Sequence, residues 1–259
     1  MTGLRQVTGT ANVLLAPNPG PMTLEGTNTW VLRAPGEDSC VVVDPGPLDE
    51  GHLADVAAAG PVAVVLLTHG HADHSAGARR LAELTGAPVR ALDSAHRLGE
   101  QGLGEGDVVA AAGVELRVLA TPGHSADSLS FVLGGQHGGD AAVLTGDTIL
   151  GRGTSVVAHP DGLLGDYLDS LSRLRELGEL TVLPGHGPEL PSAGVVAEHY
   201  LRHREARLEQ VREALAAGAS TPQQVMASVY ADVDRSLWPA ALLSARAQLA
   251  YLTHQRSGT

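Results

Sequence analysis

Seven side chains that can bind metal ions follow short apolar segments of this sequence. Residues 62–67 lead into the letters THGHADH, and three later apolar segments each end near one further histidine or aspartate. The seven are His69, His71, Asp73, His74, His124, Asp147 and His186. Histidines without such a context, His52 among them, are expected at the surface. Imidazole and carboxylate groups suit zinc, and also iron or manganese.

The spacing of these side chains divides them between two ions. His69 and His71 are two residues apart, so both can point to one side of an extended turn and bind one ion. Asp73 and His74 enter the next helix, where they can face a second ion. We predict a first ion held by His69, His71 and His124, a second held by Asp73, His74 and His186, and Asp147 as the bridge. Positions left open for water and substrate are typical of a catalytic site.

Buried strands with helices between them are predicted to give these residues a rigid base. Val- and Leu-rich runs bounded by Gly, Pro or Asp predict strands at residues 29–32, 40–43, 62–67, 116–119, 129–133, 141–144 and 180–183. Residues 76–85 and 166–177 repeat apolar side chains at helical spacing, and each run stops at a glycine. The Gly-rich residues 134–139 predict a hairpin turn. Strands alternating with helices predict an α/β fold in which helices cover the sheets.

The C-terminal part of the sequence predicts helices only. Residues 195–217 and 237–255 have the pattern of two long helices, and Thr221 is predicted to cap a third between them. We therefore predict two domains, a catalytic domain over residues 1–192 and a small helical domain over residues 193–259.

The composition is that of a folded, water-soluble protein. Hydrophobic residues make up 43% of the 259 residues and charged residues 18%, which excludes a disordered or collagen-like chain. Residues 56–68 are apolar but short, and Gly60 and Pro61 interrupt them, so we expect no membrane span and no membrane partner. The N-terminus has no apolar signal segment and Cys40 is the only cysteine, so we expect a cytoplasmic protein.

The charge balance weakens the case for a nucleic-acid partner. The chain has 29 acidic and 17 basic residues, a formal net charge of −12. Such a surface disfavours broad binding to a polyanion. Aromatic residues make up only 3%, so few side chains are available to stack on bases.

Four motifs in chain order resemble the metallo-β-lactamase superfamily, namely THGHADH, TPGHS, TGDT and PGHG. Asp44, in the letters VVVDPG, is similar to the first motif of that family. The letters PNPGPMTLEGTNTWV, GRGTSVV and PGHGPEL, with HREAR in the C-terminal helix, are similar more narrowly to the β-lactamase-like protein 2 group. The resemblance implies an αββα sandwich, two sheets faced by helices with the metals at one edge. It also implies a small winged-helix-like domain at the C-terminus.

Three polar residues near the motifs are candidates for supporting roles. We expect Asp44 to hydrogen-bond near the histidine turn and to orient the ligands; the alternative is a turn residue of an Asp-Pro-Gly sequence. Asn28 is expected to shape a loop at the rim of the site. Arg152, in the letters GRGTS, is a candidate contact for an anionic group of the substrate.

Three further candidates, His203, Arg204 and Arg207, lie on one predicted helix. The resemblance implies that this stretch lies over the mouth of the active site, where its cationic face would attract a phosphate or a carboxylate. The alternative is a solvated helix face paired with Glu205 and Glu209.

Two positions within the resemblance discriminate between reactions. Family members that reduce dioxygen at a di-iron site carry Glu where this chain has His71, so His71 favours hydrolysis. True zinc β-lactamases lack the bridging aspartate, so Asp147 argues against antibiotic hydrolysis. We therefore expect a dinuclear zinc hydrolase, with two Zn²⁺ per chain, in which a metal-bridging hydroxide attacks an ester-type bond. Asp73 and Asp147 are the expected catalytic residues; Asp73 would orient the hydroxide and pass its proton to the leaving group.

The substrate is left open by the sequence. The expected partner is a small or medium-sized ester-like molecule such as a thioester, and the resembling group suggests single-stranded RNA as the competing candidate. The alternative reaction classes are a mononuclear iron oxidoreductase similar to the persulfide dioxygenases, whose motifs overlap with these, and a true β-lactamase. The oligomeric state is not encoded in any pattern of the sequence.

Overall fold

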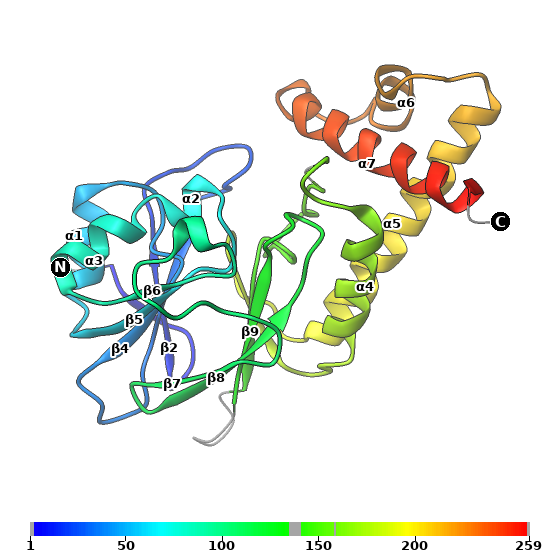
Figure 1. The fold of residues 1–259 in the computed structure, drawn as a ribbon. Helices are drawn as coiled ribbons and strands as arrows, with labels where there is room; N and C mark the ends of the chain where they lie inside the picture. Colours follow the sequence, from blue (N-terminus) through cyan, green and yellow to red (C-terminus); the bar gives the residue numbers. More distant parts are fainter. Residues whose placement is uncertain (1–2, 135–140, 158, 258–259) are drawn as a thin grey trace.

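The computed structural model describes residues 3–134, 141–157 and 159–257 and contains two β-sheets packed face to face (Figure 1). The first sheet has the order β1-β2-β3-β4-β5-β6, formed by Arg5–Gln6, Ala11–Leu15, Asn28–Leu32, Cys40–Val43, Val62–Leu66 and Val89–Arg90. The second has the order β11-β10-β9-β8-β7. In chain order, from β7 to β11, its strands are Val108–Ala111, Val114–Ala120, Leu129–Leu133, Ala142–Gly146 and Thr181–Pro184.

Each sheet mixes parallel and antiparallel strands. In the first sheet, β4, β5 and β6 run parallel to one another, and the other neighbours are antiparallel. In the second sheet, β10 and β11 are parallel, and β7 to β10 are antiparallel. β4 and β5 are buried along almost their whole length, which is typical of parallel strands covered on both faces and explains their continuous Val-rich sequences.

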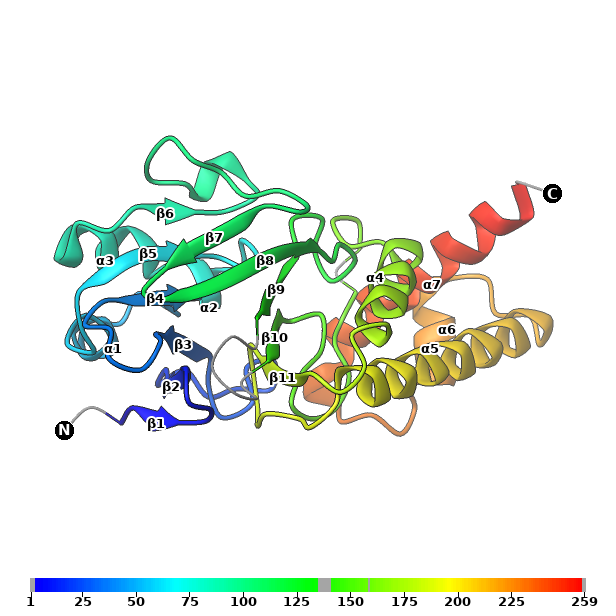
Figure 2. The same cartoon turned by 90° about the horizontal axis from the view of Figure 1, so that it is seen from below.

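Helices lie outside both sheets (Figures 1 and 2). The helices on the side of the first sheet are α1 (Glu50–Ala57), α2 (Ala72–Ser75) and α3 (Ala78–Thr85), followed by the short 3₁₀ helix η1 (Ser94–His96). Those on the side of the second sheet are α4 (Leu164–Arg175), α5 (Ala193–Ala216), α6 (Pro222–Val229), η2 (Arg235–Leu237) and α7 (Trp238–Ser257).

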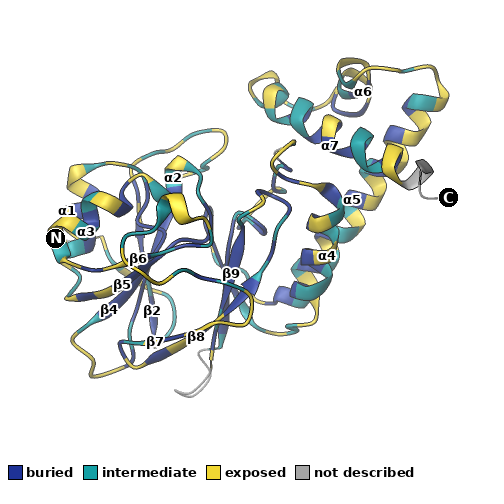
Figure 3. Ribbon diagram, in the orientation of Figure 1, coloured by how far each residue is buried: buried dark blue, intermediate teal, exposed yellow. Residues whose placement is uncertain are grey.

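The buried apolar residues form three layers around the two sheets (Figure 3). Trp30 and Phe131 are fully buried between the sheets. Leu53 of α1 and Leu81 of α3 pack on the outer face of the first sheet, and Leu171 of α4 packs on the outer face of the second. The expected αββα layering is therefore confirmed.

The strands predicted from the sequence are all present, with ends that coincide or differ by at most two residues. The sequence patterns did not predict β1, β2, β6, β7 or α1. The expectation that His52 lies at the surface is wrong, because His52 of α1 is buried and its Nε2 lies 2.9 Å from Oγ1 of Thr29. Apart from Gly134, the hairpin turn expected at residues 134–139 lies outside the described residues.

The C-terminal part is helical, as expected. Ser192 caps α5, and Thr221 caps α6 through a reciprocal pair of hydrogen bonds with Gln224. Residues 193–257 contain no strand, so the implied winged-helix likeness is not confirmed. Val211 and Ala245 belong to the same apolar cluster as α4, and the division into domains at residue 193 stays a prediction. Over the residues described, no helix combines the length and apolar character that a membrane crossing requires.

Candidate metal centre

The seven predicted ligands lie together at one edge of the sandwich. They follow β5, β8, β10 and β11 in the chain, and two of them lie on α2. In the second sheet, β8, β10 and β11 all end at the same edge, because β8 and β10 are both antiparallel to β9 and β11 is parallel to β10. Strand topology therefore brings together residues as distant in the chain as His69 and His186.

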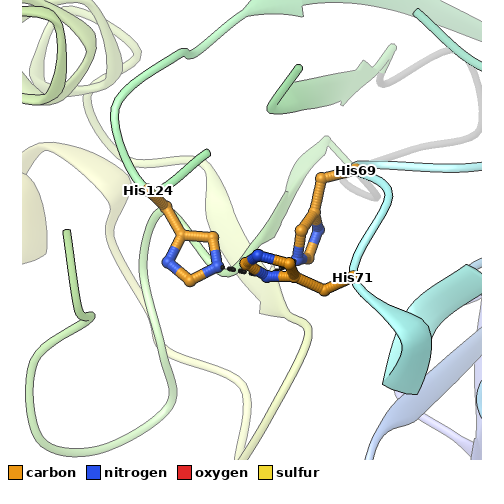
Figure 4. A group of neighbouring side chains, drawn as sticks. All are labelled: His69, His71 and His124. Atoms are coloured by element: carbon orange, nitrogen blue, oxygen red, sulfur yellow. Dashed lines mark hydrogen bonds between the residues drawn. The ribbon is translucent and has the colours of Figure 1, made fainter. Parts of the chain in front are cut away.

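The first predicted ligand group forms a compact triad of rings (Figure 4). Nδ1 of His71 lies 3.0 Å from Nε2 of His69 and 2.9 Å from Nε2 of His124. The three rings stand nearly perpendicular to one another, with interplanar angles of 81° to 88°. Three nitrogen atoms from two sheets thus point at one small volume.

The second predicted group lies beside the first. Nε2 of His186 is 3.2 Å from Nε2 of His74 and 3.2 Å from Oδ2 of Asp73. The Asp73 side chain is 30% exposed, whereas the side chains of His74 and His186 are almost completely buried. This group therefore has one carboxylate that solvent can reach.

Asp147 contacts histidines of both groups. Its Oδ2 is 3.7 Å from Nε2 of His124, and its Oδ1 is 3.3 Å from Nε2 of His74 and 3.4 Å from Nε2 of His186. These contacts lack hydrogen-bond geometry at Oδ1, so this buried oxygen has no hydrogen-bond partner. A buried carboxylate oxygen without a partner is costly unless a cation approaches it.

The other nitrogen of most of these rings is held by a partner outside the cluster. Nδ1 of His69 lies 3.0 Å from Oγ1 of Thr68, and Nδ1 of His124 lies 2.7 Å from the carbonyl oxygen of Val156. Nδ1 of His186 lies 3.1 Å from the carbonyl oxygen of Gly26. Such bonds fix the orientation of a ring and leave Nε2 to face a metal ion.

The electrostatics of the cluster favour positive charge on the side of the carboxylates. Burial would lower the pKa of His74, but Asp147 and Asp44 outweigh it and raise that pKa well above its usual value. Burial likewise opposes protonation of His186, yet the nearby carboxylates of Asp147 and Asp73 raise its pKa to about 9. Burial and neighbouring histidines lower the pKa of His69 well below its usual value.

The donor set fits metal ions. Ligand atoms bound about 2.1 Å from a tetrahedral zinc lie about 3.4 Å from one another, close to the spacings in both groups. The unpartnered Oδ1 of Asp147 and the shared position of His74 in two of the possible groups are consistent with neighbouring ions. Gly185 leaves the necessary room, because a Cβ there would lie 2.7 Å from Oδ1 of Asp147.

Asp44 supports the cluster from behind. Its Oδ1 accepts a hydrogen bond from the backbone N–H of Thr68, and its Oδ2 accepts one from the Thr68 hydroxyl at 2.6 Å. The same Oδ2 lies 2.9 Å from Nδ1 of His74. Asp44 has a φ of 52°, a conformation that aspartate tolerates better than most residues. It is thus both a turn residue and a support for the ligands.

Asn28 holds the loop that carries His186. Its side-chain amide donates to the carbonyl oxygens of Pro184 and Gly187, at 3.0 Å and 2.8 Å. The expectation that Asn28 shapes a loop near the site therefore agrees with where the structure places it.

The four basic candidates line a cavity next to the cluster, together with His124 and Asp147. Arg152 is exposed and paired with Glu25. Arg204 is buried, donates to the carbonyl oxygen of Ser155 and stacks on Tyr167. Arg207 donates to the carbonyl oxygen of Val229, and His203 lies within 3.5 Å of Thr154.

The sequence patterns missed the partners that hold the rings from outside. The carbonyl oxygens of Gly26 and Val156 and the hydroxyl of Ser155 contact Nδ1 atoms of the cluster. A backbone carbonyl carries no residue signature, so no pattern could reveal the first two. Ser155 lies in the letters GRGTSVV, but nothing in that motif indicates a contact with His124.

Comparison with known proteins relates this site to a family. Residues 22–186 match the domain of the metallo-beta-lactamase superfamily. The chain is 34% identical over 220 residues to the lactamase-like protein adaB of Aspergillus niger, covering 82% of this chain and 66% of that protein. It is 31% identical to a beta-lactamase-like protein 2 homolog of Caenorhabditis elegans, over 88% of this chain and 79% of that protein. It is 34% identical to an atrochrysone carboxyl ACP thioesterase of Aspergillus fumigatus, over 78% and 64%.

Solved structures show the same fold. A beta-lactamase domain protein from Burkholderia ambifaria superposes with a TM-score of 0.80 and 23% identity, over 97% of this chain and 88% of that chain. ETHE1 from Myxococcus xanthus gives 0.56 and 29%, over 80% and 92%. A protein solved in a di-iron-bound form gives 0.55 and 27%, over 69% and 94%. The chain thus spans somewhat less than two thirds of some curated relatives but most of these solved chains.

Proposed function

This chain belongs to the metallo-beta-lactamase superfamily, and on that basis we propose that it is a dinuclear zinc hydrolase that cleaves an ester-type bond in a small or medium-sized substrate. The observation that carries the proposal is the pair of ligand groups at one sheet edge, with Asp147 between them. The alternative of a true β-lactamase is disfavoured by Asp147, because true zinc β-lactamases lack an aspartate at this position.

Each group would hold one ion. His69, His71 and His124 would hold the first, Asp73, His74 and His186 the second, and Asp147 would contact both. Bound zinc supplies Lewis acidity, which lowers the pKa of a water molecule toward about 7 and polarises a carbonyl oxygen. The protein contributes the fixed ring orientations and a buried carboxylate that needs no reorganisation.

Asp73 is the residue best placed to handle a proton. Burial raises its pKa, but His186 and His74 outweigh that effect and lower it, so the carboxylate is ionised at neutral pH. Its partial exposure lets it accept a hydrogen bond from an attacking water and orient that water toward the substrate. It can then take the proton that the water loses as it attacks and pass that proton to the leaving group.

Among substrates, we propose a thioester. A thioesterase is among the relatives that cover most of this chain, and the net charge of −12 disfavours a polyanion. Single-stranded RNA, suggested by the β-lactamase-like protein 2 resemblance, is the competing substrate. A steep loss of binding with added salt would favour RNA, and its absence would favour the thioester.

The second candidate reaction is oxidation at iron. It is kept because histidine and carboxylate ligands also suit iron and because one similar protein was solved in a di-iron-bound form. His71 argues against this reaction, because it gives the first ligand group a third imidazole where the dioxygen-reducing members of the family carry Glu.

Metal analysis combined with a substrate panel tests the proposal. We expect natively purified protein to contain two zinc ions per chain. We also expect it to hydrolyse acyl thioesters in preference to phosphodiesters and β-lactams, to lose that activity on chelation and to regain it with zinc. One iron per chain, or two zinc ions with no hydrolysis of any panel member, would contradict it.

A further inference from the structure

A cavity of about 290 Å³ opens beside the metal centre and is lined in part by His124 and Asp147. It lies between the sandwich edge and the C-terminal helices. Its volume is at the small end of the range for small-molecule sites, roughly 300–1,000 Å³. Building on the proposed function, we propose that this cavity receives an uncharged, apolar acyl group of the substrate, and that Leu24 and α7 set the chain length that fits.

The first wall of the cavity is the loop before β3. Pro21, Met22 and Leu24 line it, and Met22 is 49% exposed. Leu24 has a φ of 56°, which is rare for a residue with a bulky side chain. The backbone N–H of Gly20 donates to the carbonyl oxygen of Leu24 at 3.0 Å and closes the loop. The loop thus holds an apolar side chain at the cavity in an unfavourable backbone conformation, which is typical of functional positions.

The second wall comes from the C-terminal helices. Val233, Leu237, Ala240 and Ala241 line the cavity from η2, α7 and the turn before them. All four are apolar, and the two alanines leave space that a larger side chain would fill. An alkyl chain that enters this space would gain about 0.8 kcal/mol for each buried methylene group, which is roughly a fourfold gain in binding.

The cationic residues at this cavity already have partners. The Arg204 guanidinium donates to Ser155 and stacks on Tyr167, and that of Arg207 donates to Val229 and stacks on Tyr230. Burial and the neighbouring arginines lower the pKa of His203 to about 4, so its ring is neutral at pH 7. The cavity therefore presents apolar surface beside guanidinium groups whose terminal nitrogens already donate to backbone carbonyls, whereas Nε of Arg204 is buried without a hydrogen-bond partner. A phosphate backbone would have to displace those bonds to pair with both guanidinium groups.

A second cavity, lined in part by His71, has the opposite character. It has a volume of about 360 Å³, and three carboxylates line it, those of Asp93, Asp127 and Asp161. An extended polyanion that passed the metal centre would meet this negative charge. An uncharged substrate avoids both problems. Its acyl group would lie in the apolar cavity and need no free cation, and its uncharged leaving group would not be repelled by the three carboxylates of the second cavity.

Chain-length selectivity tests the inference. Acetyl, butyryl, octanoyl and decanoyl thioesters of N-acetylcysteamine would be compared with the zinc-loaded full chain. We expect kcat/KM for octanoyl to exceed that for acetyl by about tenfold or more. Ala240→Phe, which fills the cavity, and Leu24→Asn, which tolerates the positive φ better than leucine but removes the apolar wall, should each reduce that ratio to about threefold or less.

Ala250→Phe is the matched control, because Ala250 lies on α7 but does not line the cavity. It should keep the wild-type ratio, and thermal melting should show that all three variants are folded. A ratio near one in the wild type, or an equal loss in Ala250→Phe and Ala240→Phe, would overturn the inference.

Binding of octanoate and of acetate, measured by calorimetry, separates this inference from the proposed function. Tighter binding of octanoate, weakened by Ala240→Phe, supports the cavity even if no thioester is hydrolysed. Hydrolysis without any preference for octanoate over acetate leaves the proposed function standing and removes the acyl cavity. Displacement of octanoate by a single-stranded oligonucleotide would overturn the inference in favour of RNA.

Discussion

Oδ2 of Asp44 lies 2.9 Å from Nδ1 of His74, and both side chains are buried from solvent. The same oxygen accepts a hydrogen bond from the hydroxyl of Thr68, so one carboxylate joins the end of β4, the turn after β5 and the start of α2. This arrangement fixes the tautomer and the direction of the His74 ring. Its Nε2 thereby faces the other candidate ligands His186, Asp73 and Asp147.

Replacing Asp44 with asparagine should weaken metal binding while the fold is retained. Asparagine tolerates a positive φ and can still accept from the backbone of Thr68, but it loses the charge that orients His74. We expect a loss of roughly 10–100-fold in zinc affinity, measured by competition with a chelator. The exposed Asp38→Asn is the control, and equal affinities for both variants would contradict the assigned role.

Asp147→Asn should have a larger effect, because the carboxylate lies between both ligand groups. We expect zinc per chain to fall below two, and turnover to fall by more than the roughly 10–100-fold that loss of an outer hydrogen bond costs. Elemental analysis and kinetics on one preparation check both. Asp169→Asn, on the exposed face of α4, is the control. Full activity with both ions retained in Asp147→Asn would contradict the proposed contact of Asp147 with both ions.

Phe131→Ala should destabilise the sandwich without a direct effect on the ligands. Phe131 is fully buried between the two sheets, so the substitution leaves a cavity. We expect a loss of about 3–5 kcal/mol in the free energy of unfolding, measured with denaturant on the zinc-loaded protein. Val108→Ala provides the comparison, because Val108 of β7 is 51% exposed and should change stability by less than about 0.5 kcal/mol.

His203 should make the protein less stable in mild acid. Its pKa is lowered to about 4 in the folded chain, so between pH 6.5 and 4 the unfolded chain binds a proton that the folded chain does not. Stability is therefore fully retained above pH 6.5 and falls as the pH drops toward 4. Allowing for partial exposure, we expect the wild type to lose about 1–2 kcal/mol more than His203→Gln over that range.

Denaturant unfolding at several pH values measures this difference, with the exposed His254→Gln as the control for removal of one histidine. A wild type that loses no more stability in acid than His203→Gln would show that the ring titrates alike in both states.

The sequence predicted most directly the strands whose side chains are buried on both faces. β4, with the letters CVVV, is buried throughout and forms a continuous apolar run that any pattern detects. β2 was missed because its letters ANVLL mix buried and exposed positions. α1 was missed because only three of its residues are buried, and one of them is the polar His52.

The cluster of candidate metal ligands could be predicted because its members are side chains of distinctive chemistry at strand ends. The cavity beside it could not, because Leu24, Ala240 and Ala241 are ordinary apolar residues whose neighbourhood exists only after folding. The same holds for Arg204, whose engagement by Ser155 and Tyr167 depends on how α5 packs.

The apolar layer outside the second sheet has a consequence for anyone who wishes to shorten this protein. Leu171 and Val182 belong to one continuous cluster with Val211, Val225 and Ala245 of the last three helices. Ending the chain after residue 192 would expose that apolar surface to solvent. It would also remove one side of the cavity that we propose for the acyl group. A chain shortened in this way is therefore expected to precipitate, and the C-terminal helices are needed to complete the cavity that we propose for the acyl group.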